Sequence, residues 1–258
     1  MNKEASLSQV ALVTGGTTGI GLATVRALRG AGMNVGLFSS STQKVEAALA
    51  VLGNEPGPEF YGATVDTSDT EAVAAFHADV ERILGQVGTL ICNAGVSSKR
   101  NGERIPLHET TRDEWETAMS VNLTGAFNCV RTSLPSMIRN QYGRIVLVGS
   151  IATRTTPKIA GAAYVASKSA LSGLMRSLVG EYSRHGITCN LVAPGNVVTE
   201  MVAYLNQDQL AALAERVPVG RLGTPDDIAM VIDMLCRPSA GFVNGAIIDV
   251  NGGEFVAV

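Results

Sequence analysis

Tyr164 and Lys168 lie four residues apart in a segment whose apolar spacing is helical, so both side chains are expected on one face of a helix. A phenol has a pKa of about 10, and a nearby ammonium lowers that pKa by stabilising the phenolate. Ser150 ends the apolar run 144–150 just upstream. A hydroxyl at a strand end and a phenol on the next helix could both bind one substrate oxygen. We infer a site for proton transfer at that oxygen.

A glycine-rich loop follows the first apolar run and precedes a helical pattern. Gly15 would allow a tight turn, Gly19 would let the backbone approach a pyrophosphate, and Gly21 would let helix and strand pack closely. The free N–H groups at the start of the helix attract anions. The spacing is Gly-x-x-x-Gly-x-Gly, which differs from Gly-x-Gly-x-x-Gly. We interpret the loop as a dinucleotide site, with these candidate binding residues: Thr14, Gly15, Thr17, Gly19, Ile20 and Gly21.

The end of the second predicted strand bears on which dinucleotide binds. NAD-selective sites usually carry an acid there, whereas this chain has Ser39, Ser40 and Ser41. Three hydroxyls can donate to a 2′-phosphate that a carboxylate would repel, so NADP(H) is favoured and NAD(H) remains possible. Lys44 is the nearest cation and is interpreted as a solvated helix residue. Asp66, at the end of the third strand, either accepts from the adenine amino group or caps the next helix.

Strands and helices alternate along the chain. Expected strands are 10–13, 34–38, 60–65, 89–92, 144–150, 188–192 and 246–250; expected helices are 22–30, 42–52, 70–84, 112–140, 164–184, 208–215 and 225–235. This alternation indicates βαβ units and a parallel sheet covered by helices on both faces. With no linker or repeat, residues 1–258 are expected to form a single α/β domain.

The composition excludes several classes of function. A net charge of −3 argues against nucleic acid or an anionic membrane as the main partner. The chain has no apolar run of membrane-spanning length, and residues 1–9 lack a signal-peptide core, so a cytoplasmic location is expected. The four cysteines lie apart in apolar segments and are expected to be buried thiols. The three histidines have no ligand spacing, so no metal site is expected.

The motifs occur in the order found in the short-chain dehydrogenase/reductase family, which the chain resembles along nearly its whole length. They are Thr14-Gly15-x-x-x-Gly19-x-Gly21, Asn93-Ala94-Gly95, Asn122, Ser150, Tyr164-x-x-x-Lys168 and Pro194-Gly195. The resemblance implies a Rossmann-type, doubly wound fold of about seven parallel strands that binds a nicotinamide dinucleotide. It implies that the protein is an oxidoreductase acting on an alcohol or ketone, and it makes a non-catalytic dinucleotide sensor a remote alternative.

The resemblance also implies residue roles. Tyr164 would be the general acid/base, Ser150 would polarise the substrate oxygen, and Lys168 would lower the Tyr164 pKa and bind the nicotinamide ribose. Asn122 would hold a water in a proton relay. Further cofactor contacts would come from Asn93, Ala94, Gly95, Pro194, Gly195, Val197 and Thr199.

The C-terminal third most resembles beta-ketoacyl-acyl-carrier-protein reductases and relatives that act on sugars, polyols and secondary alcohols. The first alternative is a 3-oxoacyl thioester reductase that docks an acidic acyl carrier protein, with these candidate cations: Lys99, Arg100, Arg104 and Arg139. The second is an enzyme for a small polar or anionic ketone or alcohol, in which Arg154 or Lys158 grips the substrate. Arg154 is the candidate substrate residue, with Ser150 and Tyr164.

Residues 196–217 are expected to form a lid over the substrate, with apolar contacts from Met201, Val202, Tyr204 and Leu205. The resemblance implies a homotetramer. Its interfaces would use the helix ending near Asn140, the Tyr164 helix and the C-terminal segment.

Overall fold

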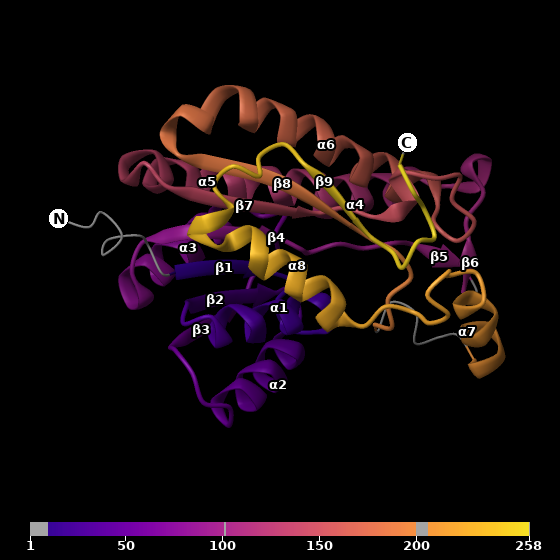
Figure 1. Ribbon diagram of the computed structural model, residues 1–258, viewed down its shortest axis with the longest axis horizontal. Coiled ribbons are helices and arrows are strands. Elements are labelled where there is room, and N and C mark those ends of the chain that lie inside the picture. Colours follow the sequence, from indigo (N-terminus) through magenta and orange to yellow (C-terminus); the bar gives the residue numbers. More distant parts are fainter. Residues whose placement is uncertain (1–9, 101, 200–205, 258) are drawn as a thin grey trace.

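The computed structural model describes residues 10–100, 102–199 and 206–257, and within them seven parallel strands form one sheet in the order β3-β2-β1-β4-β7-β8-β9 (Figure 1). The strands are β1 (Val10–Thr14), β2 (Asn34–Ser39), β3 (Phe60–Thr64), β4 (Val87–Cys92), β7 (Gly143–Val148), β8 (Ile187–Pro194) and β9 (Ile247–Val250). The predicted doubly wound α/β fold is confirmed.

The central strands are continuous apolar runs because helices cover both faces of the sheet. β1, β4, β7 and β8 are buried along their whole length. In the register, Thr14 pairs with Phe38 of β2 and with Cys92 of β4. The carboxyl ends of these strands therefore meet at one edge of the sheet, where ligands of open α/β folds bind.

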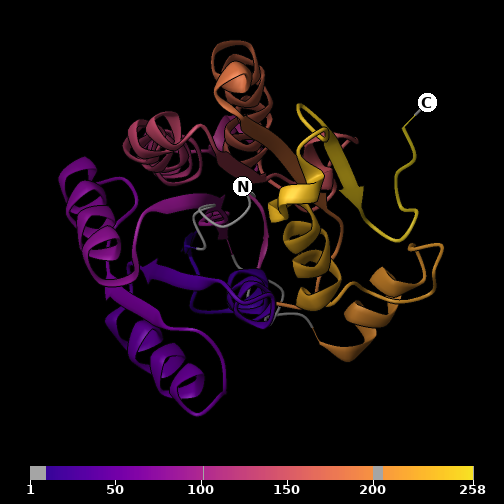
Figure 2. The ribbon, with the colours of Figure 1, turned by 60° about the vertical axis from the view of Figure 1, so that its left-hand side comes forward.

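Helices cover the sheet in two layers, which Figure 2 shows on its two sides. The helices are α1 (Gly19–Gly30), α2 (Thr42–Gly53), α3 (Thr70–Leu84), α4 (Arg112–Met119), α5 (Gly125–Asn140), α6 (Ala162–Tyr182), α7 (Gln207–Ala214) and α8 (Pro225–Cys236). On one face, Leu28 of α1 and Ile232 of α8 share a core. On the other, Phe76 of α3, Met137 of α5 and Leu171 of α6 share a second core.

Two features differ from the sequence-based expectation. Residues 112–140 are not one helix, because a π-helical turn at Ser120–Thr124 separates α4 from α5. The loop after β4 contains a small antiparallel hairpin, β5 (Lys99–Arg100) and β6 (Glu103–Arg104), which polar residues without an apolar alternation did not indicate.

All four cysteines are free and buried, as predicted. None of the helices described here has the length and apolar character that crossing a membrane requires. Among the same residues, no group of His, Cys, Asp and Glu side chains is arranged to hold a metal ion.

Candidate active site

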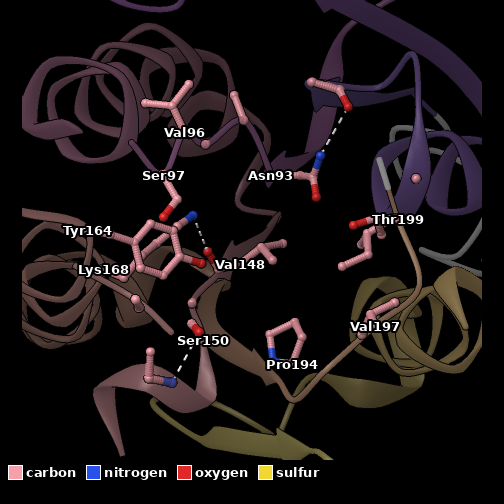
Figure 3. A pocket seen from close by; sticks show the side chains of 18 of the residues that line it. Asn93, Val96, Ser97, Val148, Ser150, Tyr164, Lys168, Pro194, Val197 and Thr199 are labelled. Atoms are coloured by element: carbon pink, nitrogen blue, oxygen red, sulfur yellow. Dashed lines mark hydrogen bonds between the residues drawn. The ribbon is translucent and has the colours of Figure 1, made fainter. Parts of the chain in front are cut away.

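A cleft of about 1070 Å³ opens at the carboxyl ends of the strands (Figure 3). It runs from Ser39 and Asp66, beyond β2 and β3, to Ser150 and Tyr164, beyond β7. Most of the residues predicted to bind the cofactor or substrate line it: Gly15, Thr17, Gly19, Ile20, Ser39, Ser40, Asp66, Asn93, Ala94, Gly95, Ser150, Tyr164, Lys168, Pro194, Gly195, Val197 and Thr199. Topology thus gathers segments that are distant in the sequence.

The glycine loop has the backbone that close approach of a ligand requires. Gly15 and Gly19 have φ of 61° and 51°, in the left-handed region that favours glycine. A Cβ at Gly21 would overlap the carbonyl oxygen of Gly15. Gly21 does not line the cleft, and its role is to let α1 begin directly against the loop.

Thr14 lies beneath this loop rather than in the cleft. Its Oγ1 accepts hydrogen bonds from the backbone N–H groups of Asn93 (3.0 Å) and Ala94 (2.9 Å). The Asn93 side chain donates in turn to the carbonyl oxygens of Thr14 (3.1 Å) and Gly15 (3.0 Å). These bonds lock the loops after β1 and β4 together, so Thr14 shapes the floor of the cleft indirectly.

The serine turn divides into two roles. Ser39 and Ser40 line the cleft, whereas Ser41 is the N-cap of α2 and accepts from the Lys44 N–H at 3.4 Å. The Lys44 side chain also lines the cleft, although the sequence suggested a solvated position.

Asp66 does not cap the following helix. Its Oδ1 accepts from the Ser68 N–H at 2.8 Å, and the carboxylate lines the cleft. The N-cap of α3 is Asp69, which accepts from Glu71 and Ala72. The geometry leaves the adenine-binding alternative for Asp66.

Ser150, Tyr164 and Lys168 come together on one side of the cleft, as Figure 3 shows. Ser150 follows β7 and caps the short turn Ile151–Thr153, with its Oγ accepting from the Ala152 N–H at 3.1 Å. Tyr164 and Lys168 project from the first turns of α6. A hydroxyl, a phenol and an ammonium at one place can hold an oxygen and move a proton to it.

The pKa values differ from the sequence-based expectation in one respect. Burial raises the pKa of the Tyr164 phenol, and the hydrogen bond with Ser150 only opposes that rise. The Lys168 ammonium points elsewhere, because its Nζ donates to the carbonyl oxygen of Val148 at 2.7 Å. Burial lowers the pKa of Lys168 to about 8. The expected lowering of the Tyr164 pKa by Lys168 is therefore not found in this structure.

Asn122 lies behind the cleft in the π-helical turn and is only 1% exposed. Its Oδ1 accepts from the Val96 N–H at 2.7 Å, and its Nδ2 donates to the Val96 carbonyl at 3.0 Å and to Ser167 Oγ at 2.9 Å. Both side-chain N–H donors are thus engaged within the protein. Asn122 holds the chain after β4 against α6.

Arg154, the candidate substrate residue, does not line the cleft. Its guanidinium donates to both carboxylate oxygens of Asp249, at 3.2 and 3.1 Å, and lies over the Phe255 ring. Its place shows that it ties the turn after Ser150 to the end of β9. The neighbouring Lys158, named as the alternative, does line the cleft.

Part of the predicted lid, residues 200–205 with Met201, Val202, Tyr204 and Leu205, lies outside the described residues. In the described part of the predicted lid, the Val198 N–H donates to the Gly223 carbonyl oxygen at 2.9 Å. Leu213, near the end of α7, lines the cleft.

The lining residues that sequence reasoning did not name individually include Asn196 and Arg216, which lie within the predicted lid, and Glu254, which lies beyond it. Asn196 donates to both carboxylate oxygens of Glu254, at 3.0 and 2.9 Å. The positions directly after Pro194-Gly195 and Gly252-Gly253 were the available signal, since both segments follow strands that end at this edge.

Comparison with known proteins gives a consistent result. A family model described as short chain dehydrogenase matches residues 9–210. The 3-oxoacyl-[acyl-carrier-protein] reductase of Aquifex aeolicus is 32% identical over 247 residues, covering 96% of this chain and 97% of that protein. Acetoacetyl-CoA reductase of Shinella zoogloeoides is 36% identical over 250 residues, covering 96% and 99%.

Solved structures agree with the sequence relatives. A 3-oxoacyl-[acyl-carrier protein] reductase from Brucella melitensis has a TM-score of 0.91 and 31% identity, covering 100% of this chain and 97% of that one. A reductase of the same description and organism, with bound NAD, has a TM-score of 0.89 and 30% identity over the same shares.

Proposed function

Since the chain belongs to the short-chain dehydrogenase family, we propose that it reduces the ketone of a 3-oxoacyl thioester to a secondary alcohol with a nicotinamide dinucleotide. The observation that carries the proposal is the meeting of Ser150, Tyr164 and Lys168 in the cleft that the glycine loop also lines. The names of the Aquifex and Shinella relatives support the thioester substrate.

The cleft fits a dinucleotide. Gly15 and Gly19 have positive φ, and a Cβ on Gly21 would overlap the loop itself, so the backbone is open to a pyrophosphate at the start of α1. Gly95 serves the other half, because a Cβ there would come within 3.1 Å of Lys168 Nζ. When bound, the dinucleotide would supply or accept a hydride.

NADP(H) is the dinucleotide we propose, on the strength of Ser39 and Ser40. Both line the far end of the cleft together with Lys44, and this turn has no carboxylate that would repel a 2′-phosphate. Asp66 would accept from the adenine amino group, and Lys168 would bind the nicotinamide ribose. Pro194, Val197 and Thr199 would cover the nicotinamide on the side seen opposite Tyr164 in Figure 3.

The chain's own residues account for the proton. During reduction, negative charge develops on the carbonyl oxygen, and the Ser150 hydroxyl and the Tyr164 phenol would both donate hydrogen bonds to it. Tyr164 then transfers its proton to that oxygen. Because burial raises the pKa of this phenol, it carries its proton at neutral pH and is ready to act as the acid. The hydrogen bond with Ser150, which opposes the rise in the Tyr164 pKa, would stabilise the phenolate that remains.

A homotetramer in the cytoplasm belongs to the same proposal. Large apolar side chains are exposed on α4 and α5 (Trp115, 38%; Phe127, 46%) and on and after α8 (Met230, 67%; Phe242, 103%). These positions support assembly through two separate faces. Light scattering of the purified protein would measure the mass of the assembly and so test the tetramer.

The decisive experiment follows NADPH and NADH oxidation by absorbance with acetoacetyl thioesters as substrates. Tyr164→Phe and Ser150→Ala should each lower kcat by about 10²–10⁴-fold while cofactor binding persists. Tyr182→Phe, at the far end of the same helix, is the matched control and should retain full activity. No oxidation of either cofactor with any ketone would refute the proposal, and an active Tyr164→Phe variant would refute the assigned acid.

A further inference from the structure

The cleft carries three cations that the proposed reaction does not use, and one of them, Lys99, has an interaction partner. Lys158 and Arg216 both line it, and neither side chain has a hydrogen-bond or ion-pair partner within residues 10–100, 102–199 and 206–257. Unpaired cations on a concave surface attract anions, because the low-dielectric walls focus their field.

These cations lie at the substrate end of the cleft. Lys158 is in the segment between Ser150 and Tyr164. Arg216 precedes a stretch that contacts the chain after β9, where the Val219 N–H donates to the Gly252 carbonyl at 3.2 Å. β9 is one edge strand of the sheet and β3, beside Ser39, is the other. The segment after Arg216 thus contacts the chain that follows the edge strand opposite the one beside Ser39.

A fixed acceptor shares this end. Glu254 is gripped through both carboxylate oxygens by Asn196, and no described cation pairs with it. Asn251 shapes the turn that presents it, accepting from the Gly253 N–H at 2.9 Å. Such a carboxylate repels a nearby anion but accepts from a hydroxyl or amide N–H. A ligand that binds both the two cations and Glu254 must carry an anionic group and, at a different position, a hydroxyl or N–H donor.

The cations expected to recognise a carrier protein or substrate are largely engaged elsewhere. Arg100 pairs with Glu109 and Glu114, and Arg154 pairs with Asp249. Lys99 also lines the cleft but has a partner, so Lys158 and Arg216 are the lining cations for which the described residues offer none.

We propose that Lys158 and Arg216 bind an anionic group of the substrate, while Glu254, held by Asn196, accepts a hydrogen bond from a hydroxyl or amide N–H of the same molecule. The inference rests on the proposed function and specifies its substrate. A coenzyme A thioester offers phosphates and an arm with amide and hydroxyl donors, and a small hydroxylated keto acid offers a carboxylate and hydroxyls. Both present the same chemistry to these residues.

The test compares charged and neutral substrates of the full-length protein. Acetoacetyl-CoA is paired with the acetoacetyl thioester of N-acetylcysteamine, and 5-ketogluconate is paired with fructose. Lys158→Gln and Arg216→Gln should each raise KM for the charged member about tenfold, with kcat and the neutral member unchanged. Lys158→Arg and Arg216→Lys keep the positive charge, so their KM values should equal those of the wild type. Arg184→Gln removes an exposed cation that does not line the cleft and is the matched control.

Glu254→Ala tests the acceptor separately. It should raise KM for acetoacetyl-CoA severalfold but leave KM for ethyl acetoacetate unchanged, because that ester has no hydroxyl or amide donor. An equal effect on both substrates, or none, would overturn the role of Glu254.

The outcomes separate the two claims. The substrate pair that shows the charge effect identifies the source of the anion, whereas unchanged KM values or equal rises for charged and neutral members overturn the inference. If no ketone is reduced, the proposed function is wrong. The inference is then judged by calorimetric titration of the NADPH-saturated protein with coenzyme A and with 5-ketogluconate. Tighter binding by the wild type than by both glutamine variants supports it, and equal or absent binding overturns it.

Discussion

The Nζ of Lys168 donates a 2.7 Å hydrogen bond to the carbonyl oxygen of Val148, the last residue of β7. This bond joins α6, which carries Tyr164, to the strand that leads to Ser150. Lys168 is only 4% exposed, and burial lowers its pKa from 10.5 to about 8. The same contact thus fixes the site and places a buried charge within it.

Stability should reflect that buried charge. Between pH 8 and 10.5 the unfolded chain holds more protons on Lys168 than the folded chain, so this residue's contribution to stability rises with pH there. Relative to Lys168→Met, the wild type should gain about 2–3 kcal/mol of unfolding free energy between pH 7.5 and pH 10. Urea unfolding of both proteins at the two pH values measures this gain. A difference that does not change with pH would contradict the lowered pKa.

Gly21→Ala should damage both stability and cofactor binding. The new methyl group would overlap the Gly15 carbonyl oxygen and come within 2.7 Å of Asn93 Nδ2, so the loop must move. We expect a loss of about 1–3 kcal/mol in unfolding free energy and at least a tenfold weaker Kd for NADPH. Gly30→Ala is the control in the same helix, since no atom lies within 4 Å of its Cβ position. Calorimetric binding and thermal unfolding would show whether the two variants differ.

The serine turn should govern the choice of cofactor. Ser40→Asp would place a carboxylate in the cleft and should lower kcat/KM for NADPH relative to NADH about 100-fold through charge repulsion. Ser41→Asp adds the same charge one residue later, at the N-cap of α2, where Asp is well tolerated. It should leave the preference unchanged. Equal effects of the two variants would show that the overall charge of the turn, rather than direct contact with the 2′-phosphate in the cleft, determines the cofactor preference.

Removing Arg154 should affect stability more than substrate binding. The Arg154 and Asp249 side chains are 24% and 17% exposed, so Arg154→Met leaves a mostly buried carboxylate unpaired, at a cost of about 1–2 kcal/mol. Arg26→Met, which breaks a more exposed pair with Glu55, should cost less than about 1 kcal/mol. Urea unfolding measures both costs. A rise in KM for charged substrates only, without loss of stability, would instead restore Arg154 as a substrate ligand.

The fold followed from the sequence because each central strand is a short apolar run between turn residues. The runs that form β1, β4, β7 and β8 are buried on both faces, and such continuous apolar runs are typical of strands in a parallel sheet. The π-helical turn was missed because the register of the apolar residues barely changes across one inserted residue. The hairpin of β5 and β6 is held by backbone pairing alone, and its composition gives no sign of it.

Residues that line the cleft were predicted from the sequence where they belong to local motifs. They were missed where tertiary contacts determine which side chains reach the cleft. Tyr164 and Lys168 are coupled by helical spacing, which a sequence displays directly. Arg154 and Lys158 are equivalent in sequence, and only the position of Asp249, 95 residues after Arg154, shows which of them is neutralised. Arg216 falls in the predicted lid and Glu254 directly follows Gly252-Gly253, but only the structure shows that both residues line the cleft.

The carboxamide of Asn122 behaves as a substitute peptide group. It accepts from the N–H and donates to the C=O of Val96, as a neighbouring β-strand would. The chain beyond β4 is thereby held as if paired in a sheet, although the partner is a side chain in a helix. Asp could accept but not donate, and Leu could do neither, so this position tolerates little besides the residue it has. The backbone position of Gly95 and Val96, next to the reacting groups, thus depends on a single side-chain amide that makes the hydrogen bonds of a β-strand.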